Sequence, residues 1–357
     1  MKYKPNTIKV DLGSYRHYWR GIRKVGKSTM YRDLLKVAFG DYKYGLLISP
    51  GNETGFKALD GIYAEEAHTW DRFVEIVDDL VENRQDNEFK MVAIDTVDEL
   101  VSIAIEKTLQ VHYIRKQEKV TSINAALGGY GAGPKYVQDL INKQIHRLES
   151  VNLGIVFIGH TKIRDVKEKN MEESYQQLTS NLESRYDGIF ADKADIIATF
   201  YVDRNVKDGS LQSTQRYIYF RTDGFVDAGS RFKNMPERVP MTPEDYLKAF
   251  EQGVKSSFET KVTDAKIEKI KKQEVEEREK LAEKFVEEEK TKAPDGSKIP
   301  ESVVELQDAI QVLLKNLDPT IKKQKGDELK AKNVNMKVKT NDNLEELKLI
   351  YNTLVSE

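Results

Sequence analysis

The clearest chemical signal in this chain of 357 residues is one segment, Gly21-Ile22-Arg23-Lys24-Val25-Gly26-Lys27-Ser28-Thr29. It fits the pattern G-x-x-x-x-G-K-[ST], in which glycines let the backbone curl until successive N–H groups point at oxyanions. The start of the helix that follows adds its positive dipole end. Lys27 would reach the outer phosphates of a nucleoside triphosphate, and the Ser28 hydroxyl would complete the shell of a Mg²⁺ ion. The segment therefore predicts a site for ATP and Mg²⁺.

Carboxylates follow two of the apolar runs that we expect to be strands. Asp95 ends the run 90–96, where nucleotide-binding α/β proteins place a carboxylate that holds Mg²⁺. Glu53 follows the run 44–49 and would face the carboxyl edge of the sheet, where it could orient an attacking water. An exposed loop glutamate is the alternative for Glu53. Asp98 and Glu99 are either helix-start carboxylates favoured by the dipole or groups that support the metal site.

Three further residues are candidates for sensing or completing a phosphate site. His160 ends the run 153–160, which we expect beside the strand that carries Asp95, so it could sense a terminal phosphate. A hydrogen-bonded histidine at a strand end is the other interpretation. Arg221 and Arg231 flank residues 222–230, from which an arginine could reach the phosphate of a neighbouring subunit. Solvated arginines on an edge strand are the alternative.

Two long polar segments are predicted at the same edge of the sheet. Residues 113–135 carry Arg115, Lys116, Lys119 and a glycine cluster at 128–133, and residues 162–186 carry basic residues, tyrosines and several acidic residues. Loops of this length inside a compact domain are usually functional or disordered. Basic residues interspersed with aromatic residues suit single-stranded nucleic acid, so a single-stranded nucleic acid is the partner that these two segments predict.

The elements that must position these residues follow from hydrophobic periodicity. Apolar runs alternate with helix-period segments to about residue 200, which predicts βαβ units with a mostly parallel sheet. The strand before the phosphate loop, expected near residues 15–20, is unusually polar for a central strand. Residues 195–203 and 215–223 flank Lys207-Asp208-Gly209-Ser210 and predict an antiparallel hairpin at the sheet edge. Helices are expected at 27–39, 64–84, 97–117 and from about 135 to 150.

The composition changes after about residue 250, and we expect three parts: 1–250, 251–300 and 301–357. Charged residues of both signs dominate 261–292, with pairs such as Glu268/Lys272 in the favourable i,i+4 order. The apolar positions are sparse, so a solvated helical strut is expected, followed by a linker at 293–300. Two apolar stripes predict a small helical module at 301–357: Val303, Leu306, Ile310, Leu313 and Leu314, and Leu344, Leu347, Ile350 and Leu354.

The composition excludes several classes of protein. There are no cysteines, which excludes a disulfide scaffold and thiolate metal sites and suits a reducing compartment. The formal net charge is −2, so attraction of nucleic acid must come from local basic segments. No apolar run approaches the length of a membrane span, and no membrane partner is expected. We therefore expect a cytoplasmic protein.

These segments in this order resemble the RecA-like P-loop ATPases of bacteriophages, a group with a minimal RecA/RadA core that assists single-strand annealing and recombination. The resemblance covers about residues 12–235. It rests on GIRKVGKST (21–29), LISPGNETGFKAL (47–59), MVAIDTVDEL (91–100), GGYGAGPKY (128–136), GIVFIGHTK (154–162), KADIIATF (193–200) and YFRTDGFVDAGSRF (219–232). Arg23 departs from the pattern, since small residues or proline are common at its position.

The resemblance implies a RecA-like core, residence in the host cytoplasm if the chain is phage-encoded, and roles for the candidate residues. Lys27 and Ser28 would bind phosphate and Mg²⁺, Asp95 would be the second-motif carboxylate, Glu53 would activate water and His160 would sense the γ-phosphate. The two polar segments match the places of the DNA-binding loops. Arg221 and Arg231 match basic residues that complete a neighbour's site, which implies a homo-oligomer, either a filament or a ring.

Two classes of function fit these residues. The first is a Mg²⁺-ATP-dependent ATPase that binds single-stranded DNA in recombination or annealing. The second is a nucleotide-gated scaffold that hydrolyses little and recruits a single-strand-binding or replication protein through residues 301–357. A packaging or helicase-loading motor is disfavoured, because the core is short and no second glutamate follows Asp95 directly.

Overall fold

The computed structural model describes residues 6–116, 118–167, 171–260, 262–291, 303–332, 334–338, 341 and 343–355. The chain divides into two compact units. The first, here called the sheet unit, comprises Met1–Ala104 and Val137–Glu283, and the second, the helical unit, comprises Ile105–Tyr136 and Lys284–Glu357. The linker predicted at 293–300 lies outside the described residues. No helix in the described part of the chain is long and apolar enough to cross a membrane.

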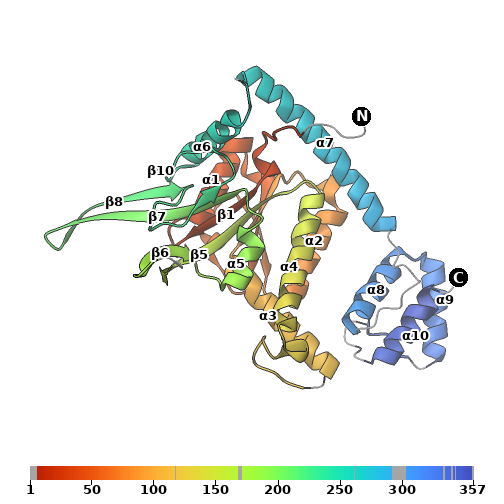
Figure 1. The fold of residues 1–357 in the computed structure, drawn as a ribbon. Coiled ribbons are helices and arrows are strands. Elements are labelled where there is room, and N and C mark those ends of the chain that lie inside the picture. The colour runs from red at the N-terminus through yellow and green to blue at the C-terminus, as the bar shows by residue number, and fades with distance from the viewer. Residues whose placement is uncertain are drawn as a thin grey trace. The chain divides into compact units, whose positions relative to one another are not determined.

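The sheet unit is built on a mixed sheet with the strand order β10-β8-β7-β1-β5-β4-β2-β3 (Figure 1). The strands that carry the site are β1 (Arg16–Gly21), β2 (Gly45–Pro50), β4 (Met91–Asp95) and β5 (Gly154–Val166). They run parallel to one another and to β3 (Tyr63–Ala67) and β7 (Ile196–Lys207). The predicted α/β fold with a mostly parallel sheet is therefore confirmed.

Helices cover both faces of this sheet. Those in or entering the sheet unit are α1 (Lys27–Phe39), α2 (Trp70–Glu82), α3 (Val97–Lys116), α4 (Ala132–Ser150), α5 (Ser184–Ala191), α6 (Pro243–Ser256) and α7 (Asp264–Thr291). Buried residues of α1 and α6 form one core cluster with the sheet, including Leu34, Leu35, Tyr246 and Phe250. On the other face, Phe190 of α5 packs against Tyr18 and Phe157.

Strand β1 is polar and yet lies in the centre of the sheet. Its polar side chains are tolerated there because they form hydrogen bonds with partners on both faces of the sheet. Side chains alternate across a strand, so His17 and Trp19 share one face. The hydroxyl of Tyr246 lies 2.8 Å from His17 Nδ1 and accepts a hydrogen bond from Trp19 Nε1 at 2.9 Å. Both side chains are fully buried. One tyrosine on α6 therefore satisfies two polar side chains of the central strand.

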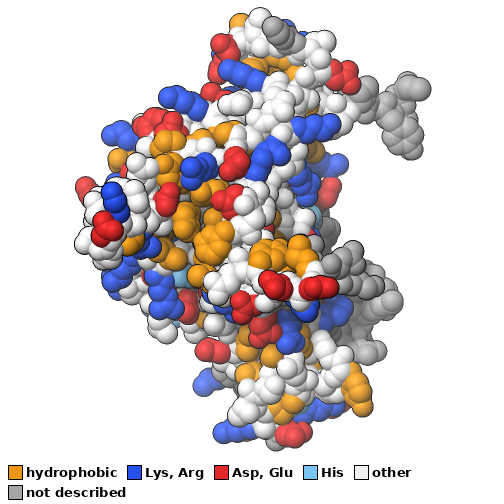
Figure 2. All heavy atoms as spheres, turned by 60° about the vertical axis from the view of Figure 1, so that its left-hand side comes forward, with side chains coloured by type: hydrophobic (Ala, Val, Ile, Leu, Met, Phe, Trp, Pro, Cys, Tyr) orange, Lys and Arg blue, Asp and Glu red, His pale blue; other side chains and the backbone are white. Residues whose placement is uncertain are grey.

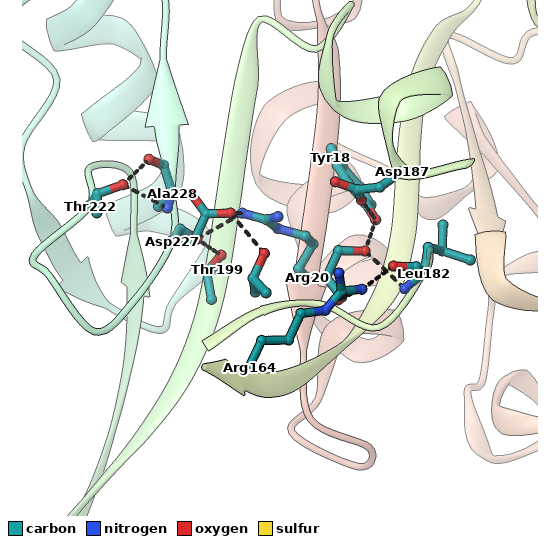
Figure 3. Close-up of polar contacts among 11 residues, drawn as sticks. Tyr18, Arg20, Arg164, Leu182, Asp187, Thr199, Thr222, Asp227 and Ala228 are labelled. Carbon is teal, nitrogen blue, oxygen red and sulfur yellow. Dashed lines mark hydrogen bonds and ion pairs between the residues drawn. The ribbon is translucent and has the colours of Figure 1, made fainter. Parts of the chain in front are cut away.

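The opposite face of β1 carries Tyr18 and Arg20 (Figure 3). The Tyr18 hydroxyl donates to Asp187 Oδ1 at 3.0 Å, and Arg20 Nη2 donates to Asp227 Oδ2 at 2.9 Å. The Arg20 side chain is only 1% exposed, so its charge is neutralised inside the fold by this ion pair. Polar residues in a central strand are thus stabilised by partners that a sequence pattern does not reveal.

Most of the described part of the second polar segment, 162–186, lies in strands and a helix, which corrects the expectation of one long loop. Strand β5 continues to Val166 and pairs antiparallel with β6 (Tyr175–Ser180), and α5 begins at Ser184. In the first segment, 113–135, helix α3 ends at Lys116, close to the predicted end at 117, and α4 begins at Ala132, slightly before the predicted start near 135.

The predicted hairpin is present and longer than expected. Strand β7 pairs antiparallel with β8 (Ser210–Tyr219), and the two extend as a ribbon beyond the rest of the sheet (Figure 1). Asp208 and Gly209 join them with φ angles of 51° and 72°, the left-handed pair that favours Asp-Gly. The hairpin is not at the sheet edge, because β10 (Arg238–Pro240) pairs with β8. The short strand β9 (Gly229–Ser230) pairs with the start of β7.

The helical unit has its own core. Helices α8 (Val303–Asn316), α9 (Pro319–Ala331) and α10 (Leu344–Val355) follow the end of α7. Their core is formed by Leu306, Ile310, Leu329, Val334, Val338, Leu347, Ile350, Tyr351 and Leu354. Most members of the two predicted stripes lie in or against this cluster. Ile114 of α3 also packs on it.

Helix α7 is not a solvated strut within the sheet unit, which corrects that expectation. Glu274 is 3% exposed and accepts hydrogen bonds from the amides of Val10 at 2.7 Å and Asp11 at 3.3 Å and from the Ser14 hydroxyl. One turn later, Arg278 donates to the Ser14 hydroxyl at 2.6 Å. Glu274 and Arg278 therefore dock α7 against residues 10–14, the segment that precedes β1.

We expect Glu274→Ala to lower the free energy of unfolding by about 2–4 kcal/mol, because two buried N–H groups and Arg278 lose an anionic partner. Urea unfolding monitored by circular dichroism measures the change. The matched control is Glu277→Ala, which removes an exposed glutamate of the same helix and should change stability by less than about 0.5 kcal/mol. Equal destabilisation by both variants would contradict the docking role of Glu274.

Candidate phosphate-binding site

The phosphate loop joins β1 to α1 at the carboxyl edge of the sheet. A Cβ atom at Gly21 would lie 2.9 Å from Phe200 Cβ, so the close approach of β7 requires glycine there. Gly26, directly before α1, has a φ of 108°, a left-handed conformation that β-carbon sterics disfavour. Glycine is therefore required at these two positions for different reasons: space at Gly21 and backbone conformation at Gly26. Together the two glycines direct the loop over the start of α1.

Lys27 is the buried charge of the site. Its side chain is 6% exposed, and Nζ donates to the carbonyl oxygens of Gly21 at 2.9 Å and Ile22 at 3.1 Å. Burial lowers the pKa of Lys27 to about 8, an effect that the nearby Asp95, Asp98 and Glu53 partly oppose. The ammonium group is therefore held by loop carbonyls rather than by a directly bonded carboxylate. Such a cation is suited to an incoming anion.

Ser28 and Asp95 bring a hydroxyl and a carboxylate together. Ser28 Oγ donates to Asp95 Oδ2 at 2.5 Å, and Asp95 is 4% exposed. Burial raises the pKa of Asp95, while the Ser28 hydrogen bond and the Lys27 charge oppose the rise. Both oxygens are ligands that Mg²⁺ prefers. Among the described residues, no group of three or more His, Asp or Glu side chains could hold a metal ion.

Glu53 lies in the turn after β2, beside this pair. Its Oε1 accepts from the amides of Thr54 and Gly55, both at 3.2 Å. A Cβ atom at Gly55 would lie 3.3 Å from Glu53 Oε1 and 3.9 Å from Ser28 Oγ, which locates the carboxylate near the phosphate loop. Its charge also acts on Lys27 and Asp95. The side chain is half-buried and belongs to the same edge of the sheet.

His160 lies on β5, the strand between β1 and β4. The strand register pairs His160 with Gly21 of β1 and Ile158 with Asp95 of β4. The prediction that the histidine strand lies beside the Asp95 strand is confirmed. Asp98 holds the residue: its Oδ2 accepts from the His160 amide at 3.0 Å and lies 3.4 Å from Nδ1. Asn181, which belongs to no recognisable sequence motif, donates to Asp98 Oδ1 at 2.9 Å.

The two candidate arginines lie elsewhere in the sheet unit. Arg221 donates to the carbonyl oxygens of Met235 at 2.9 Å and Phe232 at 3.1 Å, so its guanidinium holds a loop together. Arg231 is 63% exposed and forms an ion pair of 3.4 Å with Asp195, at the amino end of β7. Gly21 lies level with Phe200 of β7, five residues after Asp195. Neither arginine therefore joins the phosphate loop of its own chain.

The structure thus gathers Lys27, Ser28, Glu53, Asp95 and His160 at one edge of the sheet and leaves both arginines outside it. A search of curated proteins finds no match to the chain. The model of an AAA domain matches residues 14–232, which begin before β1 and extend past β9. The match includes the phosphate loop and all five gathered residues. The chain therefore belongs to the AAA domain family, whose members are P-loop proteins of the nucleotide-binding ATPase type.

Proposed function

We propose that this protein is a Mg²⁺-ATP-dependent ATPase with a RecA-like core that binds single-stranded DNA in phage-type recombination or annealing. The observation that carries the ATPase part is the meeting of Lys27, Ser28 and Asp95 at the mouth of the phosphate loop. A buried cation, a hydroxyl and a carboxylate are the groups that a Mg²⁺-bound triphosphate requires.

Each residue of the site would have a separate role in hydrolysis. The loop amides and Lys27 would bind the phosphates, and Ser28 and Asp95 would hold Mg²⁺, which neutralises charge on the phosphate oxygens when bound. Glu53 would accept a proton from the attacking water. The hydrogen bonds from the Thr54 and Gly55 amides fix the Glu53 carboxylate in place, and Ser49 Oγ donates to the Glu53 carbonyl oxygen at 2.8 Å.

Assembly into a filament or ring would supply an arginine from a neighbouring subunit. Arg231 is the better candidate, because most of its side chain is exposed and its ion pair with Asp195 is long, at 3.4 Å. Arg221 is a weaker candidate, because its guanidinium already donates to two carbonyl oxygens of its own loop. An arginine that completes a neighbour's site would make turnover depend on assembly.

Single-stranded DNA is the proposed partner of residues 113–135 in the helical unit. Tyr130 is fully exposed and Tyr113 is 45% exposed. Lys119 lies over the Tyr113 ring at 5.9 Å, and Arg115 lies over the Tyr136 ring at 5.7 Å. On the face in Figure 2, Lys and Arg are interspersed with Asp and Glu, so local aromatic and basic groups must provide the affinity.

The alternative proposal is a nucleotide-gated scaffold that hydrolyses little. Its support is the separate core of the helical unit, which gives the chain a second folded part for a replication or single-strand-binding protein. The two proposals differ in turnover and in its response to DNA.

We expect Glu53→Gln to reduce ATP turnover by about a hundredfold or more with little change in nucleotide affinity, because the amide cannot accept a proton from water. Phosphate release, measured with and without single-stranded DNA, checks this, with Lys27→Ala as the background. Glu65→Gln, which alters an exposed carboxylate on β3, is the matched control and should turn over normally. Wild-type turnover by Glu53→Gln would remove Glu53 as the base. An absence of DNA stimulation would favour the scaffold.

Tyr130→Ala should weaken single-stranded DNA binding by about five- to a hundredfold, the range expected for one lost base–aromatic stack. Fluorescence anisotropy with a labelled oligonucleotide at several salt concentrations measures it, because phosphate contacts give a salt-dependent affinity. Tyr63→Ala is the control, since Tyr63 is an exposed tyrosine of β3 in the sheet unit. Equal affinity of the two variants would contradict DNA binding at residues 113–135.

A further inference from the structure

Strand β5 changes its pairing at His160. Up to this residue β5 runs parallel to β1, and the pair Gly21 and His160 ends that register. From Thr161 onward it pairs antiparallel with β6, beginning with Thr161 and Ser180. The amide of Asn181, directly after β6, donates to the His160 carbonyl oxygen at 2.9 Å. His160 is therefore the junction between two parts of the sheet unit. It pairs with Gly21 at the edge that carries the phosphate loop, and its carbonyl oxygen binds the residue that follows β6 in the β5–β6 hairpin.

The carboxylate of Asp98 bridges both sides of this junction. One oxygen accepts from the His160 amide at 3.0 Å and lies 3.4 Å from the ring Nδ1, and the other accepts from Asn181 Nδ2 at 2.9 Å. The side chains of Asp98 and His160 are 16% and 17% exposed. Burial by itself would raise the pKa of Asp98, but the hydrogen bonds from His160 and Asn181 outweigh it and hold the pKa below its ordinary value. The bridge is thus made by an anion.

The bridge also constrains the imidazole ring. Hydrogen bonds to a carboxylate are stronger than those between neutral groups, and this carboxylate is largely shielded from water. With Nδ1 directed to Asp98, Nε2 is the ring nitrogen left for another ligand. Asp98 lies three residues after Asp95, in the first turn of α3. The same short segment therefore carries the candidate metal carboxylate and the group that orients His160.

We propose that Asp98 is a positioning residue of the phosphate site, which fixes His160 and couples it through Asn181 to the β5–β6 hairpin. The proposal rests on the proposed function, because it takes the ligand at this edge to be the phosphate of a nucleotide. It goes further by giving Asp98 and Asn181 roles in transmitting the state of the site. A carboxylate that only interacts with the dipole of α3 would contribute to helix stability and would leave the hairpin unaffected.

The first test uses the protein without nucleotide. Hydrogen exchange of the amides of β6 and Asn181 is measured by mass spectrometry for the wild type, Asp98→Asn and the control Glu106→Gln, an exposed acid of α3. An asparagine cannot supply both acceptor oxygens, so Asp98→Asn should exchange about tenfold faster in this segment. Glu106→Gln should match the wild type. Unchanged exchange in Asp98→Asn would overturn the bridging role.

The second test adds Mg²⁺ and a slowly hydrolysed ATP analogue. The wild type should change its exchange at 175–181 when it binds the analogue, whereas Asp98→Asn, at an analogue concentration that saturates this variant, should lose that change. Asn181→Ala removes only the hairpin side of the bridge and should lose the response in the same way, which keeps the test valid if Asp98→Asn folds poorly. A retained response in both variants would overturn the proposal. Failure of the wild type to bind the analogue would instead contradict the proposed function.

Discussion

The candidate phosphate site depends on the burial of one ammonium group. Lys27 is almost fully enclosed, and its Nζ donates to the carbonyl oxygens of Gly21 and Ile22. Enclosing a cation is costly unless nearby groups compensate for the lost water, and here carbonyl dipoles and the fields of Asp95, Asp98 and Glu53 compensate only in part. A site with a buried and incompletely neutralised cation favours anions. The rest of the sheet edge places the Ser28 hydroxyl and the Asp95 carboxylate, the proposed metal ligands, close to that cation.

Several distant contacts hold β1, and through it the phosphate loop, in position. Tyr246 of α6 satisfies His17 and Trp19 on one face of the strand, and Asp227 neutralises Arg20 on the other. Glu274 of α7 binds the amides of the segment before β1. Because the loop begins where β1 ends, a displacement of the strand would displace Lys27. Buried polar partners of this kind specify one register of a strand more strongly than apolar packing alone.

The sequence was sufficient to predict the α/β sheet, the phosphate loop and the strand that carries His160, because hydrophobic periodicity and motif spacing report local structure. It did not reveal the docking of α7. Glu274 looks like any surface glutamate until its partners, some 260 residues away along the chain, are known. The β5–β6 hairpin was missed because charged residues interrupt its apolar alternation. For Asp98, the sequence left two roles open, and only the contacts with His160 and Asn181 distinguish them.

The most direct test of this account is the pH dependence of Mg²⁺-ATP affinity, measured by titration calorimetry between pH 7 and pH 9. With a pKa of about 8 in the free protein, Lys27 is mostly charged at pH 7 and mostly neutral at pH 9. Phosphate binding favours the charged form, so the affinity should fall by about tenfold over this interval. Lys27→Arg, whose guanidinium stays charged, should not show this loss. Absence of binding, or an affinity of the wild type that does not change with pH, would contradict the central role of Lys27.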